Sequence, residues 1–175
     1  MKIELKNINH SEFASHETFC YEANLYVNGK PFAHVRNDGQ GGADYLYRDD
    51  RFLDGEAWNK CHALLKIHCE KEYARDYGHE WNNPDDGLIG MEYMLKGTIE
   101  TACHELMTDY LIRKALNKAL KEPCYLDGNQ IVSYNVSSKR PNIFDQIRRQ
   151  LEKPDLVFLN ELPKDEAFKL FKEVG

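Results

Sequence analysis

FCYEANLYVNGKPFAHVRN, residues 19–37, holds two β-rich runs on either side of an Asn28-Gly29 pair. Asn-Gly between such runs is the strongest short-range signal for a β-hairpin, because a type I′ turn needs positive φ at both central residues. Around this turn, the predicted pairs are Val27 with Lys30, Leu25 with Phe32, Ala23 with His34, and Tyr21 with Arg36. The residues predicted to share the core-facing side are Phe19, Tyr21, Ala23, Leu25, Val27 and Phe32.

The segments around this hairpin predict further strands and then helices. Residues 2–8 alternate as a strand, and residues 45–47 alternate in the same way after the hairpin. Apolar residues at helical spacing predict a helix over about 54–77. Its apolar side is expected to hold Ala57, Cys61, Leu64, Leu65 and His68. Glycine, proline and aspartate indicate a loop over 76–90, and a longer helix is predicted over about 88–120.

The last third of the sequence predicts mixed structure. It contains a strand over 124–126, an Asp127-Gly128 turn, a strand over 130–136, a helix over 142–152, a short strand over 155–159 and a final helix from about Lys164. Strands, then helices, then strands again indicate an α+β fold with an antiparallel sheet. We predict one α+β domain over 1–175, β-rich over 1–47, helical over 48–122 and mixed over 123–175. Its N-terminal hairpin packs on the two central helices.

Composition and charge restrict the classes of function. The chain is 42% hydrophobic and 30% charged, which is typical of a globular protein. No apolar run approaches the roughly 18 residues of a membrane span, and no signal-peptide pattern is present, so we expect a cytoplasmic protein. Five cysteines without a CxxC pair suit a reducing compartment. The net charge is −6, and its acidic excess lies in residues 1–90, which argues against a nucleic-acid partner.

Residues 36–47, RNDGQGGADYLY, place three of the chain's 11 glycines within four positions. Either the backbone turns sharply there or something approaches it closely. The stretch fits the calcium-binding nonapeptide only once, which supplies too few oxygens for calcium, and it lacks the Lys-Ser/Thr of a P-loop. We predict a contact site for a protein partner, because loops on rigid scaffolds often carry function. The predicted contact residues are Asn37, Asp38, Gly39, Gln40, Gly41, Gly42 and Asp44.

A longer run that includes these residues resembles a known sequence pattern. SHETFCYEANLYVNGKPFAHV (15–35) and NDGQGGADY (37–45) resemble small, mostly uncharacterised proteins of bacteria and their phages. In that pattern an Asn/Asp-Gly-Lys hairpin leads into Asn-Asp-Gly-x-Gly-Gly, and position 40 is often histidine, where this chain has Gln40. The resemblance covers Ser15 to Tyr45 and brings no activity with it. It implies an accessory protein of mobile elements, a class in which many members bind a host machine.

Histidine and cysteine spacing does not assemble a catalytic or metal site in the sequence. His104-Glu105 begins an H-E-x-x-H pattern, but Thr108 stands where the second histidine belongs. Glu100 and His104 share a helical face without a third ligand. The predicted hairpin register separates Cys20 from His34, which we interpret as a core histidine. We therefore predict no catalytic residue, no metal and no cofactor.

The sequence favours a small binding protein over an enzyme. Its partner is expected to be a host protein or complex, and the most specific hypothesis is a phage-encoded inhibitor of a host defence system. A small hydrolase with a metal or Cys–His site is the alternative. A nucleic-acid-binding accessory protein is a second alternative, in which Lys139 and Arg140 join Arg148, Arg149 and Lys153 on phosphates. We interpret the last three instead as the solvated face of the 142–152 helix.

Overall fold

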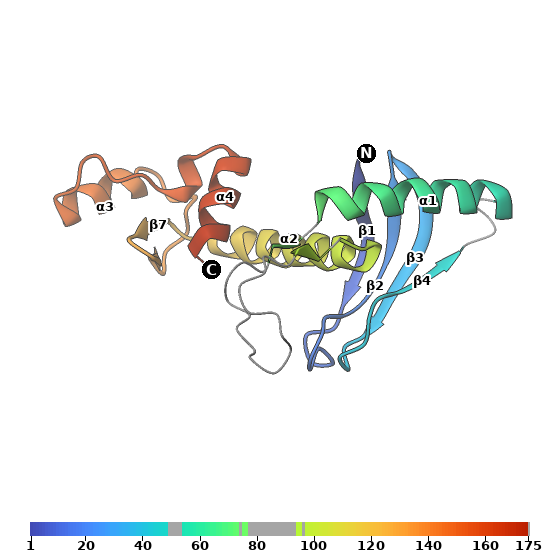
Figure 1. Ribbon diagram of the computed structural model, residues 1–175. Helices are drawn as coiled ribbons and strands as arrows, with labels where there is room; N and C mark the ends of the chain where they lie inside the picture. Colours follow the sequence, from blue (N-terminus) through green and yellow to red (C-terminus); the bar gives the residue numbers. More distant parts are fainter. Residues whose placement is uncertain (49–53, 74, 77–93, 96, 175) are drawn as a thin grey trace, which may run out of the picture. The chain divides into compact units, whose positions relative to one another are not determined.

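The computed structural model describes residues 1–48, 54–73, 75–76, 94–95 and 97–174 (Figure 1). The chain forms two compact units, Met1–Met107 and Thr108–Gly175. The first contains a four-stranded antiparallel sheet with helices, and the second contains a two-stranded sheet with helices. This composition confirms the predicted α+β class. The single domain over 1–175 stays a prediction.

In the N-terminal unit, the sheet consists of β1 (Ile3–His10), β2 (Cys20–Val27), β3 (Lys30–Asp38) and β4 (Tyr45–Arg48), hydrogen-bonded in that order. Helix α1 (Gly55–Glu72) and the beginning of α2 (Ile99–Ala119) lie along one face of this sheet (Figure 1). Phe32 stacks on Trp58 of α1 with ring centroids 4.3 Å apart, and Phe19 stacks on His104 of α2 at 4.9 Å. The prediction that the hairpin packs on two helices is therefore confirmed.

The predicted hairpin turn is confirmed, but its register is wrong beyond Tyr26. Asn28 and Gly29 have φ of 51° and 79°, and Val27 pairs with Lys30 as predicted. Tyr26 still pairs with Pro31 in this register, and a bulge then shifts the ladder, so that Leu25 pairs with Ala33. The pairs after it are Ala23 with Val35, Tyr21 with Asn37 and Cys20 with Asp38. Proline cannot donate a ladder hydrogen bond, and a bulge is a place where a strand tolerates it.

The core of the N-terminal unit follows from this bulge. Tyr21, Ala23, Leu25, Val27 and Phe32 are buried as predicted, while Phe19 is half-buried. Because the bulge moves the strand by one position, Ala33 and Val35 also face the core. The helices contribute Leu65, Cys69, Ile99, Ala102, Cys103 and Met107. Of the residues predicted for the first helix, Leu65 is buried, Ala57, Cys61 and His68 are half-buried, and Leu64 is exposed.

Both central helices are shorter than predicted. Helix α1 begins after Asp54, whose side chain accepts the Ala57 N–H at 2.8 Å, and the chain at 75–76 pairs with 94–95 in the short strands β5 (Arg75–Asp76) and β6 (Met94–Leu95). Helix α2 therefore begins at Ile99 rather than near 88. Most of the predicted 76–90 loop and the predicted helix start lie outside the described residues. No described helix is long and apolar enough to span a membrane.

The C-terminal unit contains the hairpin of β7 (Cys124–Asp127) and β8 (Gln130–Ser133), helix α3 (Ile143–Leu151), the 3-10 helix η3 (Leu159–Glu161) and helix α4 (Lys164–Val174). The hairpin turn lies at 128–129, one residue later than predicted. The predicted 155–159 strand is wrong, since it is reduced to one bridge between Phe158 and Tyr125. The Leu156 carbonyl accepts Arg148 Nε at 2.9 Å, so a side chain takes the place of a neighbouring strand.

The Asn28-Gly29 turn gives a first testable prediction. Replacing Gly29 by valine is expected to lower the free energy of unfolding by about 1–3 kcal/mol, because a β-branched residue is strained at positive φ. A Cβ at Gly29 would meet no atom within 4 Å, so the cost arises from the backbone alone. Chemical denaturation measures it, with Gly42→Val as the control at a glycine without positive φ. An unchanged midpoint for Gly29→Val would contradict the turn.

Candidate functional site

Two loops of the N-terminal unit are joined at Gly39. The backbone N–H groups of residues 16–18 all point to the Gly39 carbonyl oxygen, at 3.0 to 3.4 Å. Gly39 has a φ of +83°, and a Cβ there would lie 2.2 Å from the Ala14 carbonyl oxygen. The close approach predicted for the glycine stretch is therefore made by the chain itself. We call residues 11–19 and 38–44 the paired loops.

The other two glycines of the stretch differ from each other. Gly41 has a φ of +90°, and its N–H donates to Thr18 Oγ1 at 3.3 Å. A Cβ at Gly41 would lie 2.2 Å from Glu17 Oε2, the far end of an exposed and flexible side chain. Gly42 has no positive φ, and a Cβ there would meet nothing within 4 Å. Backbone conformation thus accounts for two of the three glycines. It does not require glycine at position 42, where contact with a partner is the remaining explanation.

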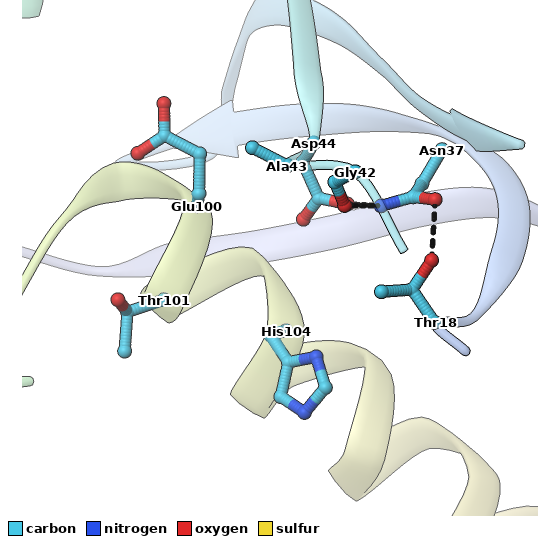
Figure 2. Close-up of a pocket in the computed structure, with 8 residues that line it drawn as sticks. All are labelled: Thr18, Asn37, Gly42, Ala43, Asp44, Glu100, Thr101 and His104. Carbon is cyan, nitrogen blue, oxygen red and sulfur yellow. Dashed lines mark hydrogen bonds between the residues drawn. The ribbon is translucent and has the colours of Figure 1, made fainter. Parts of the chain in front are cut away.

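The side chain of Asn37 holds the paired loops together by hydrogen bonds to both of them. Asn37 is only 5% exposed, and its side chain makes four hydrogen bonds (Figure 2 shows part of this network). Oδ1 accepts the Thr18 hydroxyl at 2.9 Å and the Gly39 N–H at 2.8 Å. Nδ2 donates to the Gly42 carbonyl at 3.0 Å and to Asp44 Oδ1 at 2.9 Å. One buried amide therefore fixes both loops, and its full hydrogen-bonding capacity is used.

Asp44 closes the network against the sheet. Its second oxygen, Oδ2, accepts the hydroxyl of buried Tyr21 at 2.8 Å. Burial raises the pKa of Asp44, while hydrogen bonds from Asn37 and Tyr21 and the nearby His104 favour its ionised form. Burial and the Asp44 charge raise the pKa of Tyr21, so the phenol stays protonated and donates. The carboxylate is therefore a structural acceptor with both oxygens engaged.

The seven predicted contact residues divide into an inner and an outer set. Asn37 and Gly39 are buried and Asp44 is half-buried, so these three shape the loop. Asp38, Gln40, Gly41 and Gly42 are exposed. The Asp38 carboxylate accepts the Gln40 N–H at 3.2 Å, which orders the exposed set as well. The loop therefore offers solvent a fixed backbone and two polar side chains.

A shallow pocket of about 230 Å³ lies beside the loop (Figure 2). The loop side contributes Thr18, Asn37, Gly42, Ala43 and Asp44, and α2 contributes Glu100, Thr101 and His104. The helical spacing of Glu100 and His104 was visible in the sequence, but their neighbour Asp44 comes from a distant segment. Thr101 belongs to no sequence pattern, and Thr18 lies in the run that resembles bacterial and phage proteins without any role assigned to it, so sequence reasoning missed both as pocket residues.

Cys20 and His34 do not form a nucleophilic pair. The bulge puts His34 on the outer face of the sheet, where it contacts Asn24 Oδ1 at 3.3 Å, so the interpretation as a core histidine is wrong. Cys20 faces the same side but lies four ladder positions away, about 13 Å at strand spacing. Burial raises the pKa of Cys103, which keeps it a thiol. The described residues contain no group of three or more His, Cys, Asp or Glu able to hold a metal ion.

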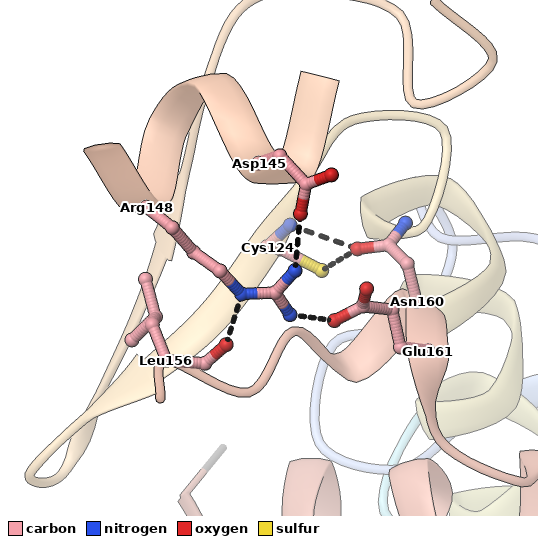
Figure 3. Close-up of polar contacts among 6 residues, drawn as sticks. All are labelled: Cys124, Asp145, Arg148, Leu156, Asn160 and Glu161. Carbon is pink, nitrogen blue, oxygen red and sulfur yellow. Dashed lines mark hydrogen bonds and ion pairs between the residues drawn. The ribbon is translucent and has the colours of Figure 1, made fainter. Parts of the chain in front are cut away.

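In the C-terminal unit, the basic residues considered for phosphate binding are not equivalent. Arg148 is half-buried and bonded to Asp145, Glu161 and the Leu156 carbonyl (Figure 3). Its guanidinium also lies 5.3 Å from the centre of the Phe158 ring. Its interpretation as part of a solvated face is therefore wrong. The remaining residues of this set are exposed: Lys139, Arg140, Arg149 and Lys153. Arg148 thus belongs to a structural ion-pair network, and the nucleic-acid alternative stays a prediction.

Comparisons with known proteins found no protein-family model, no curated protein and no solved structure that matches this chain. Function is therefore inferred from the geometry of the site and from the sequence.

Proposed function

We propose that this chain is a small accessory protein that binds a host protein or complex, and that the paired loops make the contact. The observation that carries the proposal is the Asn37 network. It holds Asp38, Gln40, Gly41 and Gly42 at the surface in one conformation. A loop fixed before binding loses little conformational entropy on association, so a small surface can still bind tightly.

The charge of the paired loops supports a basic partner. Their sequences, SEFASHETF and DGQGGAD, contain four acidic residues and no lysine or arginine. Glu12, Glu17 and Asp38 are exposed, and opposite charge on a partner would speed the encounter and set its orientation. The resemblance to proteins of bacteria and phages supports inhibition of a host complex, such as a defence system, as the outcome of binding.

A small hydrolase is the second candidate, and the pocket beside the loop is what favours it. Asp44, Glu100 and His104 line this pocket, and a carboxyl group with a raised pKa in a pocket is a candidate acid or base. A hydrolase should lose its function when His104 alone becomes alanine. A binding protein should tolerate that change and should fail only when the exposed residues of the paired loops are changed together.

The binding function is tested by pull-down from bacterial host lysate with the tagged full chain. Glu17→Lys with Asp38→Lys is expected to lower recovery of the specific partner more than tenfold at low salt, and less at high salt, because exposed charges are screened. Glu72→Lys, an exposed acidic residue of α1, is the matched control and should bind as wild type. Equal recovery by the double variant and wild type would contradict the proposal.

A further inference from the structure

Phe13 is the most exposed large hydrophobic residue among those described. Its side chain belongs to a residue that is 94% exposed, and it lies in the first of the paired loops. Burial of an aromatic ring is among the largest favourable terms in protein association. An aromatic ring that a folded loop leaves in water does not gain this burial energy within the chain. Contact with a partner protein supplies it.

The backbone that carries Phe13 is firmly held. The Ser15 N–H donates to the Glu12 carbonyl at 3.2 Å, which closes a four-residue turn with Phe13 at its second position. Ser15 Oγ donates to the Ser11 carbonyl at 2.8 Å and accepts the Cys20 N–H at 2.8 Å. The three N–H bonds to Gly39 then join the end of this loop to the other. Phe13 is therefore presented by an ordered turn and does not hang from a loose segment.

The surroundings of Phe13 restrict what can cover it. Glu12, Glu17 and Asp38 are exposed on the same paired loops, which carry no lysine or arginine. An anionic membrane surface would repel these carboxylates, so insertion of the ring into lipid is disfavoured. A protein surface with an apolar pocket and basic side chains around it satisfies both the ring and the carboxylates.

We infer that Phe13 is the anchor of the contact surface and that it enters an apolar pocket bordered by lysine or arginine on the partner protein. This inference rests on the proposed function and adds the chemistry of the partner. The acidic side chains around the ring set the orientation of docking, and the ring supplies the larger share of the affinity.

Photo-crosslinking from position 13 tests the inference. The full chain with Phe13→p-benzoylphenylalanine is irradiated in bacterial cells, and the crosslinked peptide of the partner is mapped by mass spectrometry. Tyr47→p-benzoylphenylalanine, at an aromatic residue of β4 that is 50% exposed, is the matched control. We expect position 13 to capture one protein at an apolar site with lysine or arginine beside it, and the control to capture it far less.

Affinity for the captured protein is then measured with purified variants. Phe13→Ala is expected to weaken binding about 30-fold or more, and Phe13→Leu less. Because the ring is exposed, both variants should have the melting temperature of the wild-type chain. If Phe13→Ala binds within twofold of wild type while Glu17→Lys with Asp38→Lys still fails, the anchor is wrong and the proposed function stands. If the wild-type chain retains no protein, both are wrong. Flotation with phosphatidylglycerol vesicles that depends on Phe13 would overturn the inference in favour of a membrane.

Discussion

Replacing Gly39 by alanine is expected to lower the free energy of unfolding of the N-terminal unit by roughly 3–5 kcal/mol. The left-handed φ of +83° strains any residue with a Cβ. That Cβ would also lie 2.2 Å from the Ala14 carbonyl oxygen and 2.9 Å from Cys20 Cβ. These are atoms of the backbone and of a strand, so relief requires parting the paired loops and losing the three hydrogen bonds to the Gly39 carbonyl. Tryptophan fluorescence in urea measures the loss, because Trp58 and Trp81 both belong to residues 1–107.

The neighbouring glycines supply graded controls. At Gly42 an added Cβ meets no atom within 4 Å and φ is not positive. The free energy of unfolding of Gly42→Ala should therefore lie within about 0.5 kcal/mol of the wild-type value. Gly41→Ala should fall between the two, near 1 kcal/mol, because its φ of +90° strains an alanine while the Cβ clash is only with the movable Glu17 carboxylate. If all three variants had the same stability, the pairing of the loops through Gly39 would be wrong. Gly42→Ala also separates architecture from contact, since any loss of partner binding there occurs without a loss of stability.

In the hairpin, the turn could be predicted from the sequence but the register of the strands could not. The Asn28-Gly29 turn and the alternation of β2 depend on neighbouring residues, so both were predictable. The register was not, because one extra residue near Pro31 shifts every later pair and moves His34 to the outer face. Proline within a strand run was the available signal, since proline within sheets is confined to edges, strand starts or bulges.

The candidate site depends on contacts between distant segments. Thr18 and Asn37 are 19 residues apart, and Glu100 and His104 come from a helix that begins more than 50 residues after Asp44. A glycine-rich stretch therefore predicted an unusual backbone correctly, but not which part of the chain would approach it. Phe13 was not predicted for a related reason. A single apolar residue in a polar loop shows no hydrophobic periodicity from which a role could be inferred.

Asn37→Asp is expected to be the most damaging change that preserves the shape of the side chain, with a loss of roughly 3–5 kcal/mol at pH 7. The oxygen that accepts from Thr18 and Gly39 is kept. The amide that donates to the Gly42 carbonyl and Asp44 Oδ1 becomes a second carboxylate oxygen, which faces two acceptors. Asn37→Ala removes all four hydrogen bonds but adds no charge, so it should cost about 2–4 kcal/mol. Urea denaturation followed by tryptophan fluorescence measures both variants relative to wild type.

The dependence on pH distinguishes the added charge from the lost hydrogen bonds. Burial already raises the pKa of Asp44 above its ordinary 3.8, and a second carboxylate beside it raises the pKa of the pair further. The folded state then takes up a proton at a pH where the unfolded chain is still ionised, so its stability rises relative to wild type as the pH falls. The deficit of Asn37→Asp should shrink by about 1–2 kcal/mol between pH 7 and pH 4, while that of Asn37→Ala should shrink less, because this change removes one hydrogen bond to ionised Asp44 but adds no second carboxylate. Parallel curves for the two variants would mean that Asn37 does not donate to Asp44.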